Sequence, residues 1–342
     1  MELQFGLDTF GDVTVDLQGA PLSQAQVIRN VVEQGMLADE LGLDAFSVGE
    51  HHRPDFAISA PDIVLAGLAT STRRIKLGSA VVVLSSDDPI RVYERFATID
   101  ALSGGRAEPV LGRGSFIESF PLYGFDLADY ETLFEEKLAV FAELLKEEPV
   151  TWSGSYRTPL EGVDVFPKTE GGRMFAWVAV GGSPQSVVRA AHYRFGLQLA
   201  IIGGPADRFK PFVDLYHRAL DEFGATEPLP VAVHSPGHVA DTDDLASTQL
   251  YEHFKANRDR IGADRGWGPM SRDEYDNEVE HGALYVGSPE TVARKIAATV
   301  RQLGVQRFDL KYASGPMPHE QLMRSIELYA TRVVPLVRDM LS

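Results

Sequence analysis

The chain has 342 residues, 44% of them hydrophobic, and its 32 basic and 49 acidic residues give a formal net charge of −17. This length fits two ordinary domains or one large α/β barrel, and the acidity argues against a nucleic-acid partner, which requires clustered positive charge. The absence of cysteine excludes disulfides, thiolate nucleophiles and cysteine-ligated metals. Because we find neither a basic apolar leader nor 18 consecutive apolar residues, we expect a cytoplasmic protein without a membrane span.

Strand and helix signals alternate along the chain. Several of the apolar runs are nearly continuous, as in parallel strands buried on both faces. Eight such runs are expected to form strands, at 3–7, 45–48, 75–84, 107–112, 175–180, 197–202, 229–234 and 307–312. The helices between them should begin at caps that are followed by helical patterns, at Ser23, Asp88, Ser183 and Ser288. Eight strand–helix units favour a (β/α)8 TIM barrel over an open doubly wound sheet with a second domain.

Two long segments depart from the repeat. Residues 113–172, after the fourth strand, contain an expected helix at about 130–146 and a patch rich in Trp, Gly and Pro. Residues 235–285, after the seventh strand, are polar and carry Trp267. We therefore expect one domain spanning 1–342, with two insertions that serve as active-site loops or lids.

The second strand ends in a carboxylate and two adjacent imidazoles, Glu50, His51 and His52. Barrels of this class place their chemistry at the carboxyl ends of the strands, and histidine titrates nearest neutrality. Because successive strand side chains point to opposite faces, both histidines can share a pocket only where the chain leaves the strand. The motif predicts catalytic residues, although a polar strand cap would have the same sequence.

Small residues open the third strand, and glycines flank Arg113 after the fourth. Small side chains at 78–80 either allow close packing or leave room for a flat ring against the backbone. The planar guanidinium of Arg113 suits a phosphate or a carboxylate. By itself, neither feature is specific.

A glycine-rich turn, Gly181 and Gly182 followed by Ser183, Pro184 and Ser186, leads from the fifth strand into a helix. Free backbone N–H groups and a hydroxyl cap at a helix start can bind an anion, although an ordinary capped helix has the same pattern. Because Arg113 would supply a counter-charge, we favour phosphate binding. The Gly-x-Gly-x-x-Gly dinucleotide fingerprint is absent, which weakens a Rossmann interpretation.

Four residues raise a second possibility, a metal-dependent barrel hydrolase: His51, Glu50, His234 and His238. Histidines and carboxylates at strand ends do bind metals in such barrels. The adjacent rings of His51 and His52 are, however, difficult to aim at one ion. We expect no metal and keep the hydrolase as an alternative.

In this order, the motifs resemble the bacterial luciferase-like family of flavin-dependent monooxygenases. The matching stretches cover about residues 5–205 and 283–313, and only their succession is specific for the family. They are the Gly-Glu-His-His motif, 74–84, 88–92, 99–106, 112–114, 181–184 and 286–290. The segment 235–285 does not align, so its contacts with substrate are unassigned.

The resemblance implies a TIM barrel that binds reduced FMN at the carboxyl ends of its strands and uses oxygen to oxidise a small organic substrate. Arg113 and the turn at 181–186 would hold the flavin phosphate. A non-proline cis peptide would fall between Ala80 and Val81, against the flavin ring. His51 would be the acid/base residue, with Glu50 and His52 in the same motif.

The resemblance also bears on partners. It implies a homodimer packed through helices at about 61–71 and 89–103, and a separate flavin reductase that supplies reduced FMN. A deazaflavin-dependent dehydrogenase or reductase on the same fold remains the nearest rival. A flavin-binding protein without catalysis is a further alternative.

Overall fold

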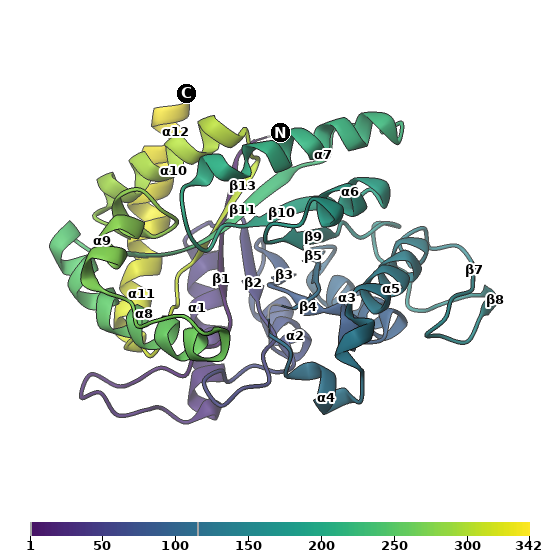
Figure 1. Cartoon of the computed structure of the whole chain (residues 1–342), viewed down its shortest axis with the longest axis horizontal. Coiled ribbons are helices and arrows are strands. Elements are labelled where there is room, and N and C mark those ends of the chain that lie inside the picture. Colours follow the sequence, from purple (N-terminus) through teal and green to yellow (C-terminus); the bar gives the residue numbers. More distant parts are fainter. Residues whose placement is uncertain (1, 115) are drawn as a thin grey trace.

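The computed structural model describes residues 2–114 and 116–342 (Figure 1). Each of the eight predicted strand regions contains at least one strand. The strands are β1 Gln4–Thr9, β2 Ala45–Val48, β3 Lys76–Ser79, β4 Val82–Val83, β5 Ala107–Glu108, β6 Val110–Gly112, β7 Val150–Trp152, β8 Leu160–Val163, β9 Trp177–Val180, β10 Gly196–Ala200, β11 Val231–Val239, β12 Tyr285–Gly287 and β13 Arg307–Lys311.

Eleven of these strands form one curled sheet. Its order is β4-β6-β9-β10-β11-β13-β1-β2-β3-β5, with β12 paired to β11, and every pairing is parallel. β3 and β4 follow one another in a single stretch of chain, and so do β5 and β6. β3 pairs with β5 at one end of this order, and β4 pairs with β6 at the other end. The sheet therefore curls round until its ends meet, and the predicted α/β class is confirmed.

Helices surround the sheet (Figure 1). All four predicted caps are confirmed, since each side chain accepts a hydrogen bond from a backbone N–H in the first turn of its helix. The helices are α1 Gln24–Glu40, α2 Pro61–Ser71, α3 Pro89–Ser103, α4 Ser119–Tyr123, α5 Tyr130–Leu144, α6 Pro184–His192, α7 Lys210–Glu222, α8 Asp243–Arg265, α9 Arg272–Glu280, α10 Pro289–Leu303, α11 His319–Leu328 and α12 Val334–Leu341. Within the described residues, no helix is both long enough and apolar enough to cross a bilayer.

The boundaries expected for the two insertions need correction. The seventh strand, β11, runs to Val239 rather than ending at residue 234, because its polar-looking residues 235–238 are buried and β12 pairs beside them. The segment 113–172 includes α5, whose Leu133, Phe134 and Leu138 are buried in the main core. Among the strands of the described residues, only the antiparallel pair β7–β8 stands apart from the large sheet. Thus much of both segments is part of the framework.

Candidate active site

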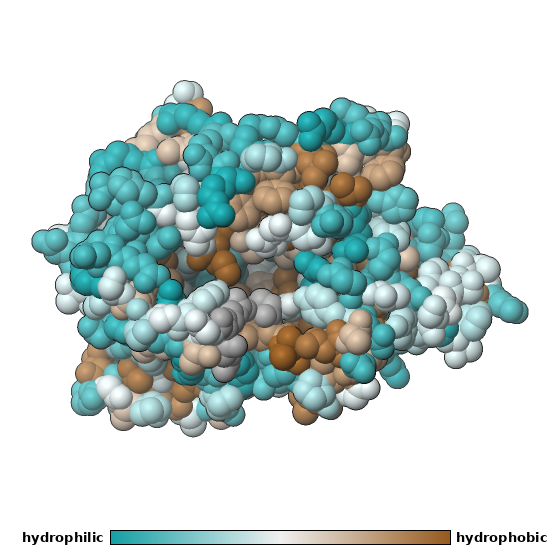
Figure 2. Space-filling model, viewed as in Figure 1, coloured by the Kyte–Doolittle hydropathy of each residue, from teal (hydrophilic) through white to brown (hydrophobic). Residues whose placement is uncertain are grey.

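Two adjoining cavities lie at the carboxyl ends of the strands. We call the first the strand-end cavity, with a volume of about 510 Å³, and the second the aromatic pocket, with about 630 Å³. Both volumes suit small-molecule sites. They share five lining residues: Phe10, Gly181, Ala200, Ile202 and His234. Figure 2 shows a recess near the middle of the viewed face with apolar surface around it.

The Glu-His-His motif follows the end of β2 beside the strand-end cavity, and of its two histidines His51 but not His52 lines that cavity. His51 lines the cavity, and its Nδ1 lies 3.5 Å from a carboxylate oxygen of Glu118. Burial by itself raises the pKa of Glu118, but the hydrogen bond with His51 and bonds to backbone N–H groups lower it overall. The rings of Phe10, Phe56 and Phe116 surround His51 with centroids within 5 Å of its own. Its orientation is therefore fixed by packing.

His52 points away from that cavity. Its Nε2 lies 2.9 Å from Oε1 of Glu50, and this hydrogen bond raises the pKa of His52 above its ordinary value. The other oxygen of Glu50 accepts the backbone N–H of Val83 at 3.1 Å. Glu50 itself lines the strand-end cavity. The pair therefore connects the end of β2 to β4.

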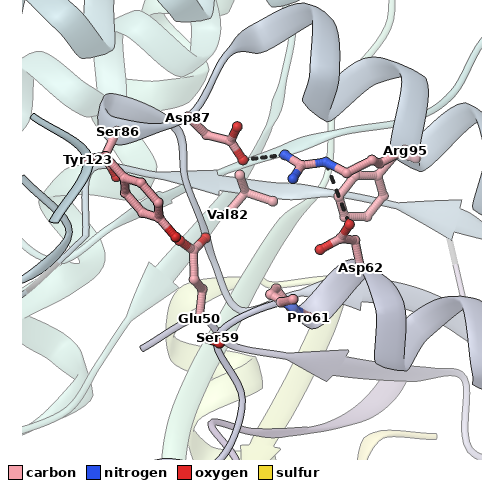
Figure 3. A pocket seen from close by; sticks show the side chains of 11 residues that line it. Glu50, Ser59, Pro61, Asp62, Val82, Ser86, Asp87, Arg95 and Tyr123 are labelled. Atoms are coloured by element: carbon pink, nitrogen blue, oxygen red, sulfur yellow. Dashed lines mark hydrogen bonds and ion pairs between the residues drawn. The ribbon is translucent and has the colours of Figure 1, made fainter. Parts of the chain in front are cut away.

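Glu50 also faces a smaller cavity of about 230 Å³ on the outer side of the motif (Figure 3). In this cavity Arg95 lies between Asp87, with which it forms a short ion pair, and Asp62, 3.6 Å from its Nε. Tyr123 lies on the opposite wall, near Glu50. Because the guanidinium is already held by two carboxylates, we interpret the residues around this cavity as structural support for the Glu-His-His motif.

The backbone between β3 and β4 forms one wall of the strand-end cavity. The peptide between Ala80 and Val81 is cis, as expected, and both residues line the cavity. Gly112 faces them from β6, where a Cβ would come within 2.5 Å of the Val81 side chain. A Cβ on Gly49 would likewise approach the Ala80 carbonyl oxygen to 2.7 Å. The wall therefore depends on small residues in both neighbouring strands.

Arg113 enters the same cavity from the end of β6. Its guanidinium forms a short ion pair with Glu131 and lies 5.5 Å from the ring centroid of Tyr130. The Tyr130 hydroxyl donates to the Gly114 carbonyl at 2.7 Å, which ties α5 to this loop. Since Glu131 is 60% exposed, an incoming anion can replace it as the partner of Arg113.

The glycine turn and α6 lie across the cavity. Gly181 lines both cavities and Gly182 lines the aromatic pocket, and nothing lies within 4 Å of the Cβ position of either. Ser183 caps α6 by accepting the Ser186 N–H at 3.3 Å, and Ser186 is buried. Neither serine lines the strand-end cavity or the aromatic pocket. An anion has open space beside this helix start, and an FMN phosphate fits the cationic and small-residue lining.

Six aromatic side chains dominate the aromatic pocket: Phe10, Phe116, Phe209, Phe212, Phe254 and Trp267. Several of its charged groups already have partners. Lys311 contacts Asp12 at 3.4 Å, and Arg258 contacts Glu274 at 2.8 Å. The pocket therefore suits a largely apolar, flat ligand.

The residues proposed for a metal site do not converge. His51 and His234 line the strand-end cavity, but His238 is fully buried and its Nε2 bonds Gln249 at 2.8 Å. Burial lowers the pKa of His238 to about 4. Over the side chains that the structure describes, those of residues 2–114, 116–263 and 266–342, no group of three or more His, Cys, Asp or Glu has the geometry to hold a metal ion. The geometry disfavours the hydrolase alternative.

Sequence reasoning missed one pair of residues. His234 was considered only as a metal ligand, yet its Nδ1 lies 2.7 Å from Oδ2 of Asp8, a buried residue on β1. Phe10, two residues after Asp8, lines both cavities. The available signal was a polar residue inside an apolar strand, which often marks a functional position in a barrel.

Comparison with known proteins places this geometry in a family. The model of the luciferase-like monooxygenase family matches residues 9–307. The 4-hydroxyprotoasukamycin monooxygenase of Streptomyces nodosus subsp. asukaensis is 28% identical over 313 residues, covering 87% of this chain and 83% of that protein.

Two solved structures share the fold. The oxygenating constituent of 3,6-diketocamphane monooxygenase from Pseudomonas putida, in complex with FMN, has a TM-score of 0.78 at 21% identity, covering 98% of this chain and 99% of that one. The coenzyme F420 dependent tetrahydromethanopterin reductase of Methanopyrus kandleri has a TM-score of 0.72 at 18% identity, again covering 98% and 99%. Together with the family match, these relationships show that the chain belongs to the luciferase-like monooxygenase family.

Proposed function

We propose that this protein is an FMN-dependent monooxygenase built as a (β/α)8 barrel, in which reduced flavin and oxygen act on a small organic substrate. One observation carries the proposal. Arg113, the open Gly181–Gly182 turn, the Ala80–Val81 wall and His51 border two adjoining cavities, one of which can hold a flat cofactor and the other its substrate.

Each of these groups has a separate task. Arg113 and the start of α6 hold the phosphate, with Ser183 and Ser186 shaping the turn. Ala80 and Val81 form the surface against which the ring lies. FMN, when bound, supplies the oxygen chemistry, and the protein contributes binding, orientation and exclusion of water.

His51 is proposed to move the proton. Its Nδ1 faces Glu118, and no residue that the structure describes hydrogen-bonds its Nε2. That nitrogen is therefore available to a ligand in the strand-end cavity. Glu50 and His52 support this histidine through the bonds that connect the motif to β4.

The proposal extends to partners. We infer a homodimer through α2 and α3, which pack on each other and expose Ile63 and Leu102, with side chains 70% and 48% accessible. Apolar side chains exposed on neighbouring helices favour association. We also infer a separate reductase that delivers reduced FMN, and a cytoplasmic location.

A deazaflavin-dependent reductase or dehydrogenase is the second candidate, because a coenzyme F420 dependent enzyme shares the fold. Anaerobic titration of the purified protein with reduced FMN and with reduced F420 separates the two, followed by oxygen-uptake measurements over a substrate panel. We expect reduced FMN to bind and substrate to stimulate oxygen uptake. Binding of F420 alone, with no oxygen consumed, would overturn the proposal.

A further inference from the structure

We propose that His234, positioned by Asp8, is a second acid/base residue, and that it ionises a hydroxyaromatic substrate held in the aromatic pocket. The oxidation of that substrate rests on the proposed function. Its binding and ionisation rest only on the pocket and on this pair of residues.

The position of His234 distinguishes it from His51. His234 lies on β11 and lines both cavities, whereas His51 lines only the strand-end cavity. The ring of Phe10 separates the two imidazoles. It is stacked with His234 at 6.1 Å and 13°, and it meets His51 edge-on at 4.9 Å. A ligand in the aromatic pocket therefore meets the imidazole of His234 at the boundary.

Asp8 determines which nitrogen of the His234 imidazole carries the proton. It lies on β1, is 1% exposed, and faces Nδ1 of His234 at 2.7 Å across the intervening strand β13. A carboxylate only accepts hydrogen bonds, so Nδ1 carries the proton and Nε2 presents a lone pair. The second Asp8 oxygen, Oδ1, is buried and has no hydrogen-bond partner in the described structure. The hydrogen bond with Nδ1 of His234 is thus the one that the structure describes for this carboxylate.

Nε2 of His234 has no hydrogen-bond partner among the described residues. Two charged residues on the neighbouring strand β13 have partners of their own. Asp309 accepts a hydrogen bond from Gln198 at 2.9 Å, and Lys311 contacts Asp12 at 3.4 Å. Arg208 is exposed at the pocket and forms no described ion pair, so it can attract an anion.

The lining defines the class of ligand. Aromatic walls favour a planar ring through offset or edge-to-face contacts, and a basic nitrogen at the inner boundary requires an acidic proton on that ring. A phenolic hydroxyl supplies both features. The O–H proton moves to Nε2, the oxygen keeps the bonding electron pair, and the products are a phenolate and an imidazolium paired with Asp8. The phenolate's charge delocalises into the ring and makes its carbons electron-rich, which suits an oxygenation.

The test uses 4-nitrophenol, whose phenol and phenolate absorb at different wavelengths, with the full-length protein free of flavin at one fixed pH near neutrality. We expect wild type to bind it mainly as the phenolate. In His234→Gln the bound phenolate-to-phenol ratio should fall on the order of tenfold, the loss of one charge-assisted hydrogen bond. Asp8→Asn should lower the ratio in the same direction. His51→Gln is the matched control and should leave the ratio unchanged.

Binding of 4-nitroanisole, which lacks the proton, should be the same in every variant and shows that the pocket is intact. If Asp8→Asn fails to fold, the His234→Gln result decides. An unchanged ratio in His234→Gln, a fall in His51→Gln, or no binding of 4-nitrophenol to wild type would each overturn the inference. If FMN binding and oxygen uptake fail while 4-nitrophenol is still ionised, only the proposed function is overturned.

Discussion

The strand-end cavity and the aromatic pocket share five residues but are built in different ways. The first is bordered by backbone and small side chains at the ends of neighbouring parallel strands, with Arg113 as its cation. The second takes its aromatic wall from the loops after β1 and β6, from the start of α7 and the residue before it, from α8 and from the chain that follows α8. Rigid strand ends suit the proposed binding of a cofactor. Helices outside the strand–helix repeat, such as α8, can change in sequence without disturbing the barrel strands. They are therefore suited to determine which substrate binds.

The largest effect should come from His51, the proposed acid/base residue of the strand-end cavity. Replacing His51 by Ala should lower turnover by about 10²–10⁴-fold, the usual contribution of general acid/base catalysis. FMN affinity should barely change, because the phosphate contacts are elsewhere. Steady-state oxygen uptake and a flavin titration on the same variant measure both effects.

The control for this experiment is His217→Ala, an exposed position on α7. It should match wild type in both measurements. If turnover of His51→Ala also matches wild type, His51 has no part in the mechanism, and His234 becomes the remaining histidine shared by both cavities.

The same contrast explains what the sequence could predict. Buried parallel strands are short apolar runs, and their carboxyl ends must meet at one edge, so His51, Arg113 and Gly181 could be brought together before any coordinates existed. Strand alternation did not decide which of the two histidines faces the cavity, and His52 was expected beside His51 in the catalytic motif. The cis peptide at Ala80–Val81 was expected from the family resemblance alone, since no local sequence pattern requires it.

The aromatic pocket could not be predicted in this way. Asp8 and His234 are 226 residues apart, and nothing local in the sequence indicates that they pair. Trp267 and Phe254 follow no strand and share no short motif, so their meeting depends on how α8 packs. The strand β11 was cut short for a related reason. Its residues 235–238 have the composition of a loop, and the pairing of β11 with β12 could not be seen from the sequence.

Arg113 should give the next largest effect, confined to the strand-end cavity. Arg113→Ala should weaken FMN binding by about 10–100-fold, because a hydrogen bond to a charged group contributes roughly 1.5–3 kcal/mol. Added salt should weaken FMN binding in wild type more than in the variant, because screening acts on the lost charge pair. A flavin titration at two ionic strengths measures this.

Arg208→Ala is the matched control, since it removes a guanidinium from the aromatic pocket alone. It should leave FMN affinity unchanged. Equal losses of FMN affinity in the two variants would mean that the phosphate is not held specifically by Arg113, and that the two cavities are not divided between cofactor and substrate.

Trp267 tests the aromatic pocket in the opposite direction. Its side chain is 47% exposed, so Trp267→Ala should change the free energy of unfolding little. Loss of an aromatic contact of roughly 0.5–1.5 kcal/mol beyond area burial should raise KM for an aromatic substrate up to about tenfold, with kcat and FMN affinity retained. Kinetics over a substrate series measures this. A matching loss of FMN affinity would mean that the two cavities act as one binding site.

The smallest effect concerns the support of the strand-end cavity and depends on pH. The hydrogen bond with Glu50 raises the pKa of His52 above its ordinary value of 6.5. A histidine with a raised folded-state pKa binds its proton more tightly when folded. Its stabilisation is therefore fully present below pH 6.5 and is lost as the pH rises through the folded value.

Since one hydrogen bond contributes about 1 kcal/mol net, we expect an effect of this size from the pair, whose side chains are 7% and 9% exposed. Denaturant unfolding of wild type and His52→Gln across this pH range measures it, and the difference between their free energies of unfolding should shrink as the pH rises. A difference that stays constant would mean that His52 supports β4 through packing alone. A difference that grows with pH would contradict the assigned direction of the pKa shift, and Glu50 would then hold Val83 without help from a charged imidazole.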